Sequence, residues 1–117
     1  TDAVCFHLAS HSRLAELVRG PVKAIMFNLG YLPGGDRNLT TRADSTLAAL
    51  EQAVNLTAPN GILSVMCYPG HEGGDMEAAA VEQFLSRLPH HLWRTGKYQL
   101  LNTSTPAPFQ ICAFRLD

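Results

Sequence analysis

Three segments rich in glycine, histidine, hydroxyl and amide groups are the places where this chain of 117 residues could carry chemistry. They are HLASH at residues 7–11, NLGYLPGGD at residues 28–36 and YPGHEGG at residues 68–74. Each follows a short apolar run that we predict to be a strand. Because open α/β sheets bind ligands outside the carboxyl ends of their strands, we expect a binding site where these three segments meet.

Asn28 and Tyr31 are the candidate catalytic residues of the NLGYLPGGD segment. Asn28 ends an apolar run, so its amide oxygen can accept a hydrogen bond from a substrate amine and orient the lone pair of that amine. Tyr31 can stack on a base or on a sulfonium cation. Gly34 and Gly35 permit positive φ and a close approach of a ligand to the backbone. The alternative is a strand-to-helix loop in which the glycines serve only the turn and Asn28 is a cap.

Histidines and their neighbours supply further candidate polar groups. Ser10 and His11 can hydrogen-bond an adenine edge or a ribose, or they can simply cap a short helix. His71 lies beside Glu72 and can act as an acid or base near neutral pH, although an exposed loop histidine is the alternative. No spacing matches a zinc site, a P-loop or a nucleophile elbow, so the sequence predicts no metal site and disfavours a hydrolase.

The elements that must position these groups alternate between strands and helices. Helices are predicted after Ser10 or Ser12, from Thr41, and around Val81, with glycine or proline near their ends. Alternation predicts a mostly parallel α/β sheet, in which the apolar strand 22–28 is covered on both faces, and a short final link predicts an antiparallel carboxy-terminal strand pair. The predicted strands are residues 3–9, 22–28, 62–68, 97–102 and 109–116, with a turn at residues 59–61.

Composition limits the class of protein. Hydrophobic residues make up 46% and charged residues 16% of the chain, which is typical of a single globular domain over residues 1–117. A net charge of −1 shows no basic excess, so any RNA contact must be weak, local or helped by another segment. No apolar run is long enough to cross a bilayer. Three cysteines without metal-binding spacing favour buried thiols in a reducing cytoplasm.

The sequence resembles a known family of enzymes. FNLGYLPGGD at residues 27–36, followed by Thr40-Thr41 and Ser45-Thr46-Leu47, resembles the putative rRNA methylase family of bacterial class I S-adenosylmethionine-dependent methyltransferases. FHLASH at residues 6–11 and YPGHEGG at residues 68–74 support a resemblance that spans nearly the whole chain. The family includes a tRNA methyltransferase that acts on the aminomethyl group of wobble 5-aminomethyl-(2-thio)uridine. The resemblance implies a Rossmann-like sheet, S-adenosylmethionine as cofactor and RNA, in particular tRNA, as substrate.

The resemblance also implies roles for individual residues. Asn28-Leu29-Gly30-Tyr31 stands where amine methyltransferases often carry an Asn-Pro-Pro-Tyr motif. Asn28 and the nearby backbone would hold the acceptor amine in line with the methyl-sulfonium group, Tyr31 would pack on the base, and Ser10 and His11 would lie near the adenosine. The implied cofactor-binding residues are Ser10, His11, Asn28, Leu29 and Gly30, and the implied substrate-binding residues are Gly34, Gly35, Asp36 and His71.

The sequence departs from the family pattern because it contains no acidic glycine-rich cofactor loop. In the family's sheet, that loop belongs to an earlier segment whose two strands lie between the strands equivalent to residues 3–9 and 22–28. We therefore expect a truncated sheet in which residues 3–9 pair with residues 22–28, or in which a second copy pairs with that edge as a homo-oligomer such as a dimer. We also expect weak cofactor binding by this chain alone. The alternative function is a non-catalytic truncated homologue that acts as a binding or oligomerisation module.

Overall fold

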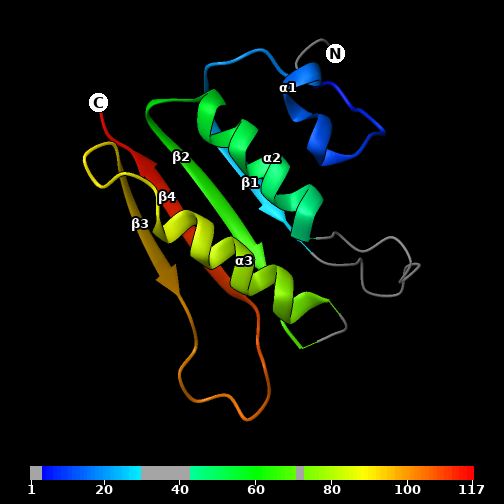
Figure 1. Ribbon diagram of the computed structural model, residues 1–117, viewed down its shortest axis with the longest axis vertical. Helices are drawn as coiled ribbons and strands as arrows, with labels where there is room; N and C mark the ends of the chain where they lie inside the picture. Colours follow the sequence, from blue (N-terminus) through cyan, green and yellow to red (C-terminus); the bar gives the residue numbers. More distant parts are fainter. Residues whose placement is uncertain (1–3, 30–42, 71–72) are drawn as a thin grey trace.

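A computed structural model describes residues 4–29, 43–70 and 73–117, which form a four-stranded sheet with helices on one face (Figure 1). The strands lie in the order β1-β2-β4-β3. β1 and β2 are parallel, whereas β4 is antiparallel to both β2 and β3. The predicted α/β class and the antiparallel carboxy-terminal pair are confirmed, with parallel pairing confined to β1–β2 in the described sheet. The strand bounds are β1 (Val22–Asn28), β2 (Thr57–Cys67), β3 (Trp93–Tyr98) and β4 (Phe109–Arg115).

The helices connect the strands across a single face of the sheet. α2 (Ala43–Leu56) follows β1, and α3 (Gly74–Ser86) follows β2. A short 3-10 helix, η1 (His11–Arg13), and α1 (Leu14–Leu17) precede β1 and lie beside α2 (Figure 1). η1 begins as predicted for a serine cap, since the Ser10 hydroxyl accepts a hydrogen bond from the Ser12 N–H at 3.2 Å. Among the described residues, no helix is both long and apolar enough to cross a membrane.

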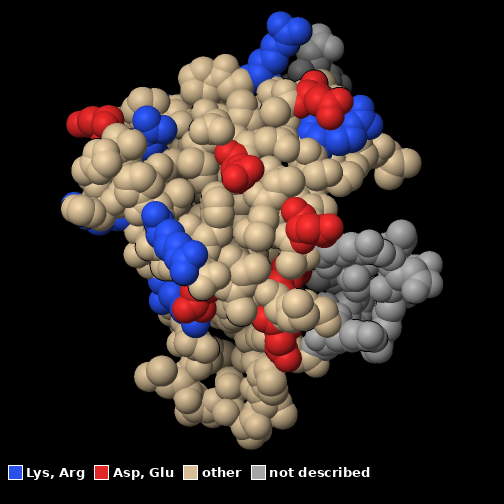
Figure 2. All heavy atoms as spheres, in the orientation of Figure 1, with Lys and Arg blue, Asp and Glu red and all other residues tan. Residues whose placement is uncertain are grey.

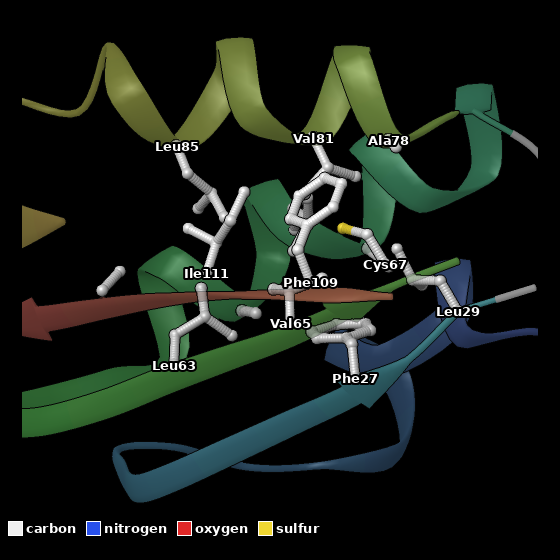
Figure 3. Packing of buried hydrophobic residues seen from close by; sticks show 14 of the residues in the cluster. Phe27, Leu29, Leu63, Val65, Cys67, Ala78, Val81, Leu85, Phe109 and Ile111 are labelled. Atoms are coloured by element: carbon white, nitrogen blue, oxygen red, sulfur yellow. The ribbon is translucent and has the colours of Figure 1, made fainter. Parts of the chain in front are cut away.

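The hydrophobic core lies between these helices and the sheet (Figure 3). Alternate residues of each strand point to the helices, so Leu63 and Val65 of β2 meet the apolar face of α3 that carries Val81 and Leu85. All four side chains are completely buried. Burial of one such side chain contributes about 1.5–3 kcal/mol, so this layer fixes the positions of the two helices over the sheet.

The opposite face of the sheet is covered by none of the described elements. On β1, Met26 is 82% exposed, and on β4, Phe114 is 49% exposed. The prediction that residues 22–28 are covered on both faces is therefore wrong, because β1 is an edge strand and the described helices pack on one side only. Association of two copies through the β1 edge stays a prediction.

Residues 4–9 form no strand, although the sequence predicted one over residues 3–9. Their apolar side chains lie in solvent, with Phe6 93% exposed and Leu8 fully exposed. The expected pairing with residues 22–28 is absent from the described sheet, so that prediction is wrong. An apolar run becomes a strand only where a neighbouring strand supplies hydrogen bonds and side-chain contacts, and no described strand flanks this segment.

The predicted turn at residues 59–61 is a bulge within β2. Val22 of β1 pairs with Thr57, whereas Ala24 pairs with Ile62, so residues 58–61 leave the regular ladder. A side chain at Gly61 would come within 2.8 Å of the Ala58 carbonyl oxygen and 2.9 Å of the Lys23 carbonyl oxygen. Glycine is therefore required at this close approach of two backbones.

Candidate functional site

The carboxyl ends of β1 and β2 lie at one edge of the sheet, where α2 and α3 begin (Figure 1). Asn28 ends β1 and pairs with Met66, and Cys67 ends β2. α2 and α3 both begin near this edge, so their first turns bring Thr46 and Glu77 to it. This is the edge at which open α/β sheets bind their ligands.

A buried chain of polar atoms links three of these elements. The Thr46 hydroxyl donates a hydrogen bond to Oε2 of Glu77 at 2.8 Å, and its oxygen lies 3.5 Å from Nε2 of His11. Thr46 is fully buried, and Glu77 is only 3% exposed. Because Glu77 lies in the first turn of α3, the helix dipole favours its negative charge there. The buried carboxylate of Glu77 thus has a hydrogen-bond partner, and Thr46 connects it to the imidazole of His11, which is only partly buried.

His11 is held in a defined position by its surroundings. Its ring meets the Phe27 ring edge-on, with centroids 5.9 Å apart and an interplanar angle of 65°. Burial lowers the pKa of His11 below its ordinary value, and this effect exceeds the opposing influence of the Glu77 charge. The imidazole is therefore neutral at pH 7 and can both donate and accept a hydrogen bond.

Gln52 of α2 fixes the backbone that directly follows His11. Its Oε1 accepts a hydrogen bond from the Ala15 N–H at 2.7 Å, and its Nε2 donates one to the Ser12 carbonyl at 2.6 Å. A single side chain thus satisfies one donor and one acceptor of the segment formed by η1 and α1. The position of His11 is accordingly determined by α2 rather than by the preceding residues 4–9.

The pKa of His11 predicts a measurable dependence of stability on pH. Since the pKa in the folded chain lies below the ordinary value of 6.5, the unfolded chain binds this proton more readily between those two values. The free energy of unfolding should therefore fall as the pH drops below about 6.5, and the contribution of His11 should be complete above it. Urea unfolding between pH 7 and pH 5 measures this loss. H11Q should show a shallower decline, whereas the exposed H91Q should follow the wild type; equal slopes in both would contradict the prediction.

Four of the predicted site residues fall within the described chain. Ser10 is exposed and its hydroxyl lies 2.8 Å from that of Ser12, next to His11. Asn28 is exposed at the end of β1. Leu29 is buried, and its N–H donates to the Met66 carbonyl at 3.0 Å. The predicted residues Gly30, Tyr31, Gly34, Gly35, Asp36 and His71 lie outside the described residues.

The structure brings only some of these residues together. Alternation along β1 puts Phe27, and the His11 ring against it, on the face covered by helices. Asn28, one residue further on, belongs to the uncovered face with Met26. His11 and Asn28 therefore flank the same edge of the sheet from its two faces, and a ligand across that edge would be approached from both sides.

Sequence reasoning missed Thr46 and Glu77. Both sit four residues before a fully buried side chain of the same helix, Leu50 in α2 and Val81 in α3. Residues four apart share one face of a helix, so this spacing predicts that each polar group points toward the core. A threonine and a glutamate on apolar helix faces, both in first turns, are the signal that could have identified the buried chain.

The cysteines are expected to differ sharply in reactivity. Burial raises the pKa of Cys67 to about 12, with Glu77 and Glu82 adding to the rise. Cys5 is exposed, so the predicted burial holds for Cys67 and is wrong for Cys5. At pH 8 about one Cys67 in ten thousand would be a thiolate, so a maleimide should label Cys5 rapidly and Cys67 only after unfolding. Mass spectrometry of the labelled peptides checks this; rapid labelling of native Cys67 would contradict it.

Charged side chains form no large area of one sign on the face that carries the helices. Figure 2 shows the lysine and arginine side chains toward the left and top of this face, whereas several acidic side chains and no basic ones lie beside the grey residues at the right. Within the described ranges, no group of three histidine, cysteine, aspartate or glutamate residues is arranged to hold a metal ion. What the described part of the edge offers is hydrogen-bonding groups, namely an imidazole, a hydroxyl and an amide.

Comparison with known proteins gives consistent matches. The family model described as "Putative rRNA methylase" matches residues 1–114. The chain is 41% identical over 109 residues to the chloroplastic tRNA (mnm5s2U34)-methyltransferase of Arabidopsis thaliana. A structure described as a putative rRNA methylase from Clostridium thermocellum superposes with a TM-score of 0.86 at 33% identity. A putative methyltransferase from Streptococcus mutans, in complex with SAH, superposes with a TM-score of 0.83 at 32% identity.

The matches cover most of this chain but only part of each relative. They include 92% of the chain against 39% of the Arabidopsis protein. They include 91% of the chain against 57% of each of the two bacterial structures. The similarity therefore concerns one portion of those proteins, and that portion includes the sheet edge at which His11 and Asn28 lie.

Proposed function

Because this chain belongs to the family described as putative rRNA methylases, we propose that it is the acceptor-binding portion of an S-adenosylmethionine-dependent RNA methyltransferase. The observation that carries the proposal is the placement of Asn28. It ends an edge strand, its side chain is exposed, and the following Leu29 is tied back to β2 through the Met66 carbonyl. This hydrogen bond fixes the backbone next to Asn28, whose side-chain amide must be positioned.

In the proposed reaction, this chain's contribution is to orient an amine. The oxygen of the Asn28 amide accepts a hydrogen bond from an N–H of the neutral acceptor amine, so the amine lone pair points away from Asn28 toward the methyl donor. S-adenosylmethionine, when bound, would supply the methyl group as an electrophile, with S-adenosylhomocysteine as the leaving group and one proton lost from the methylated amine to solvent. Holding the two reactants in line converts an encounter in solution into a step within one complex, which lowers the barrier to methyl transfer.

The described residues fit a nucleoside cofactor. The neutral imidazole of His11 and the exposed hydroxyl of Ser10 lie at the same sheet edge and can accept hydrogen bonds from ribose hydroxyls or an adenine amine. The Streptococcus mutans relative has SAH in its structure, which supports S-adenosylmethionine as the methyl donor in this family. Gly30 joins this proposed set from outside the described residues.

A tRNA is the proposed substrate, with a wobble 5-aminomethyluridine as the acceptor. The support is the 41% identity with a protein named as a tRNA (mnm5s2U34)-methyltransferase. The primary amine of such a base is the group that the Asn28 amide suits. Tyr31, Gly34, Gly35, Asp36 and His71 complete the proposed substrate-binding set. We place the protein in the cytoplasm by the same proposal, although the Arabidopsis relative is named as chloroplastic.

Calorimetric titration of the purified chain with S-adenosylmethionine, with its mass in solution measured alongside, tests the proposal. Micromolar binding is expected if the pocket is complete in this chain or is completed across a dimer. Methyl transfer to aminomethylated tRNA is then the decisive assay, with unmodified tRNA, which lacks the acceptor amine, as the negative control. No binding at millimolar cofactor would overturn the proposal that this chain alone is an enzyme. It would leave the non-catalytic binding module as the function to test.

A further inference from the structure

We propose that Glu77 and Thr46 are positioning residues that hold His11 with its proton on Nε2, so that Nδ1 faces the nucleoside of the cofactor as a hydrogen-bond acceptor. The assignment of the nucleoside as the ligand rests on the proposed function. The assignment of the proton to Nε2 does not, since it follows from the hydrogen-bonding groups of the described chain.

The proton position follows from counting donors. A threonine hydroxyl has one proton, and a carboxylate can only accept. The 2.8 Å contact therefore directs the Thr46 proton to Oε2 of Glu77, which leaves the lone pairs of the Thr46 oxygen for its other neighbour. That neighbour is Nε2 of His11 at 3.5 Å, and only a protonated Nε2 is attracted to a lone pair. At 3.5 Å the contact is long, so it selects an orientation more than it adds stability.

A neutral imidazole with its proton on Nε2 has an unprotonated Nδ1. Among the described residues, none forms a hydrogen bond with Nδ1 of His11, and the ring is only partly buried. Burial lowers the pKa of His11, which keeps this nitrogen free to accept at neutral pH. An acceptor of this kind suits a ribose hydroxyl or an adenine amine, both of which are donors.

Two side chains contact the His11 ring, and a third holds the backbone that follows it, so both the ring and its segment are positioned. Phe27 packs against it edge-on, and Thr46 contacts Nε2. Gln52 binds the backbone at Ser12 and Ala15, so the segment cannot rotate independently of α2. A buried glutamate without its hydroxyl partner is costly, which explains why the acid and the threonine occur together.

The first test uses the free protein and does not depend on any ligand. Long-range proton–nitrogen NMR spectra distinguish the protonated ring nitrogen from the bare one. In the wild type at pH 7.5, Nε2 of His11 should carry the proton. T46S keeps the hydroxyl and should keep this tautomer, whereas the nearly isosteric T46V should shift the nitrogen signals toward the averaged values of a free neutral imidazole. A proton on Nδ1 in the wild type, or the same spectrum in T46V and T46S, would overturn the positioning role.

The second test uses S-adenosylhomocysteine as the probe. Saturation should move the Nδ1 signal of His11, and T46V should bind about fivefold more weakly than T46S, as expected for one misaligned hydrogen bond. Thermal unfolding of both variants shows whether each remains folded. Binding that leaves Nδ1 unchanged would overturn the acceptor role while the proposed function survives. Failure of the wild type to bind would overturn the cofactor assignment and the proposal that this chain alone is an enzyme, and the tautomer spectra would still decide the positioning role.

Discussion

Replacing Leu63 with alanine is expected to lower the free energy of unfolding by about 2–5 kcal/mol. Leu63 is completely buried, and it lies on β2 opposite α3, between the strands β1 and β4 that both pair with β2 (Figure 3). The substitution removes one methine and two methyl carbons from a site between the sheet and α3, where the packed surroundings can collapse only in part. Urea unfolding followed by circular dichroism gives the change directly.

Leu101 provides the matched control for this substitution. It is the same residue type, but it is 95% exposed in the connection between β3 and β4. L101A should change the free energy of unfolding by less than about 0.5 kcal/mol. A loss below about 1 kcal/mol for L63A, or equal losses for the two variants, would contradict the placement of Leu63 in the core.

Replacing Asn28 with alanine is expected to lower the rate of methyl transfer to tRNA by at least about 100-fold, because the acceptor amine loses its orienting partner. The fall should appear in kcat, since the misaligned amine still binds through the base. Stability should hardly change, because the Asn28 side chain is exposed and its backbone hydrogen bonds in the sheet are retained. Initial rates with labelled S-adenosylmethionine, compared at saturating tRNA, measure the effect.

Asn55 is the control residue for this experiment. It is an exposed asparagine on α2, near the end of the helix that lies away from the proposed site. N55A should transfer methyl groups at the wild-type rate. If N28A keeps more than a tenth of the wild-type rate while N55A is unaffected, Asn28 does not orient the amine and the proposed mechanism is wrong.

The strands of the sheet were predictable where a local pattern and the tertiary surroundings agree. The continuous apolar run VKAIMFN predicted β1 with the bounds observed, and Phe109–Arg115 of β4 ends one residue before its predicted end. Both segments have β-branched and aromatic side chains that fit a pleated surface. β3 was predicted four residues too late, because Gly96 and the charged residues near it conceal a strand that begins at the buried Trp93.

Residues 4–9 show why an apolar run alone is insufficient. The segment AVCFHLA has the composition of a strand, yet Phe6 and Leu8 are exposed in the structure. A strand forms only where it pairs with a neighbouring strand. The local sequence does not show whether the folded sheet supplies such a neighbour. The uncovered face of β1 went unpredicted for the same reason, since an apolar run does not reveal which of its faces a helix will cover.

The candidate site was predictable in its location and only partly in its members. Polar residues after successive strands indicated the carboxyl edge, and His11 and Asn28 do lie there. Thr46 and Glu77 were missed because what marks them is a hydrogen bond of 2.8 Å between two helices. The two residues are 31 positions apart in the sequence. The roles of His11 and Asn28 remain predictions that the experiments above decide.

The central position of β2 has a consequence for how the molecule opens. β2 alone joins the parallel part of the sheet to the antiparallel hairpin of β3 and β4, so either side can separate locally while the other stays paired. Amide protons of β2 that are hydrogen-bonded to β4 then stay protected when β1 separates, whereas amide protons at the β1 edge exchange through that smaller opening. Slow exchange should thus be concentrated on the amides between β2 and β4, and exchange should be faster at the β1 edge of the sheet.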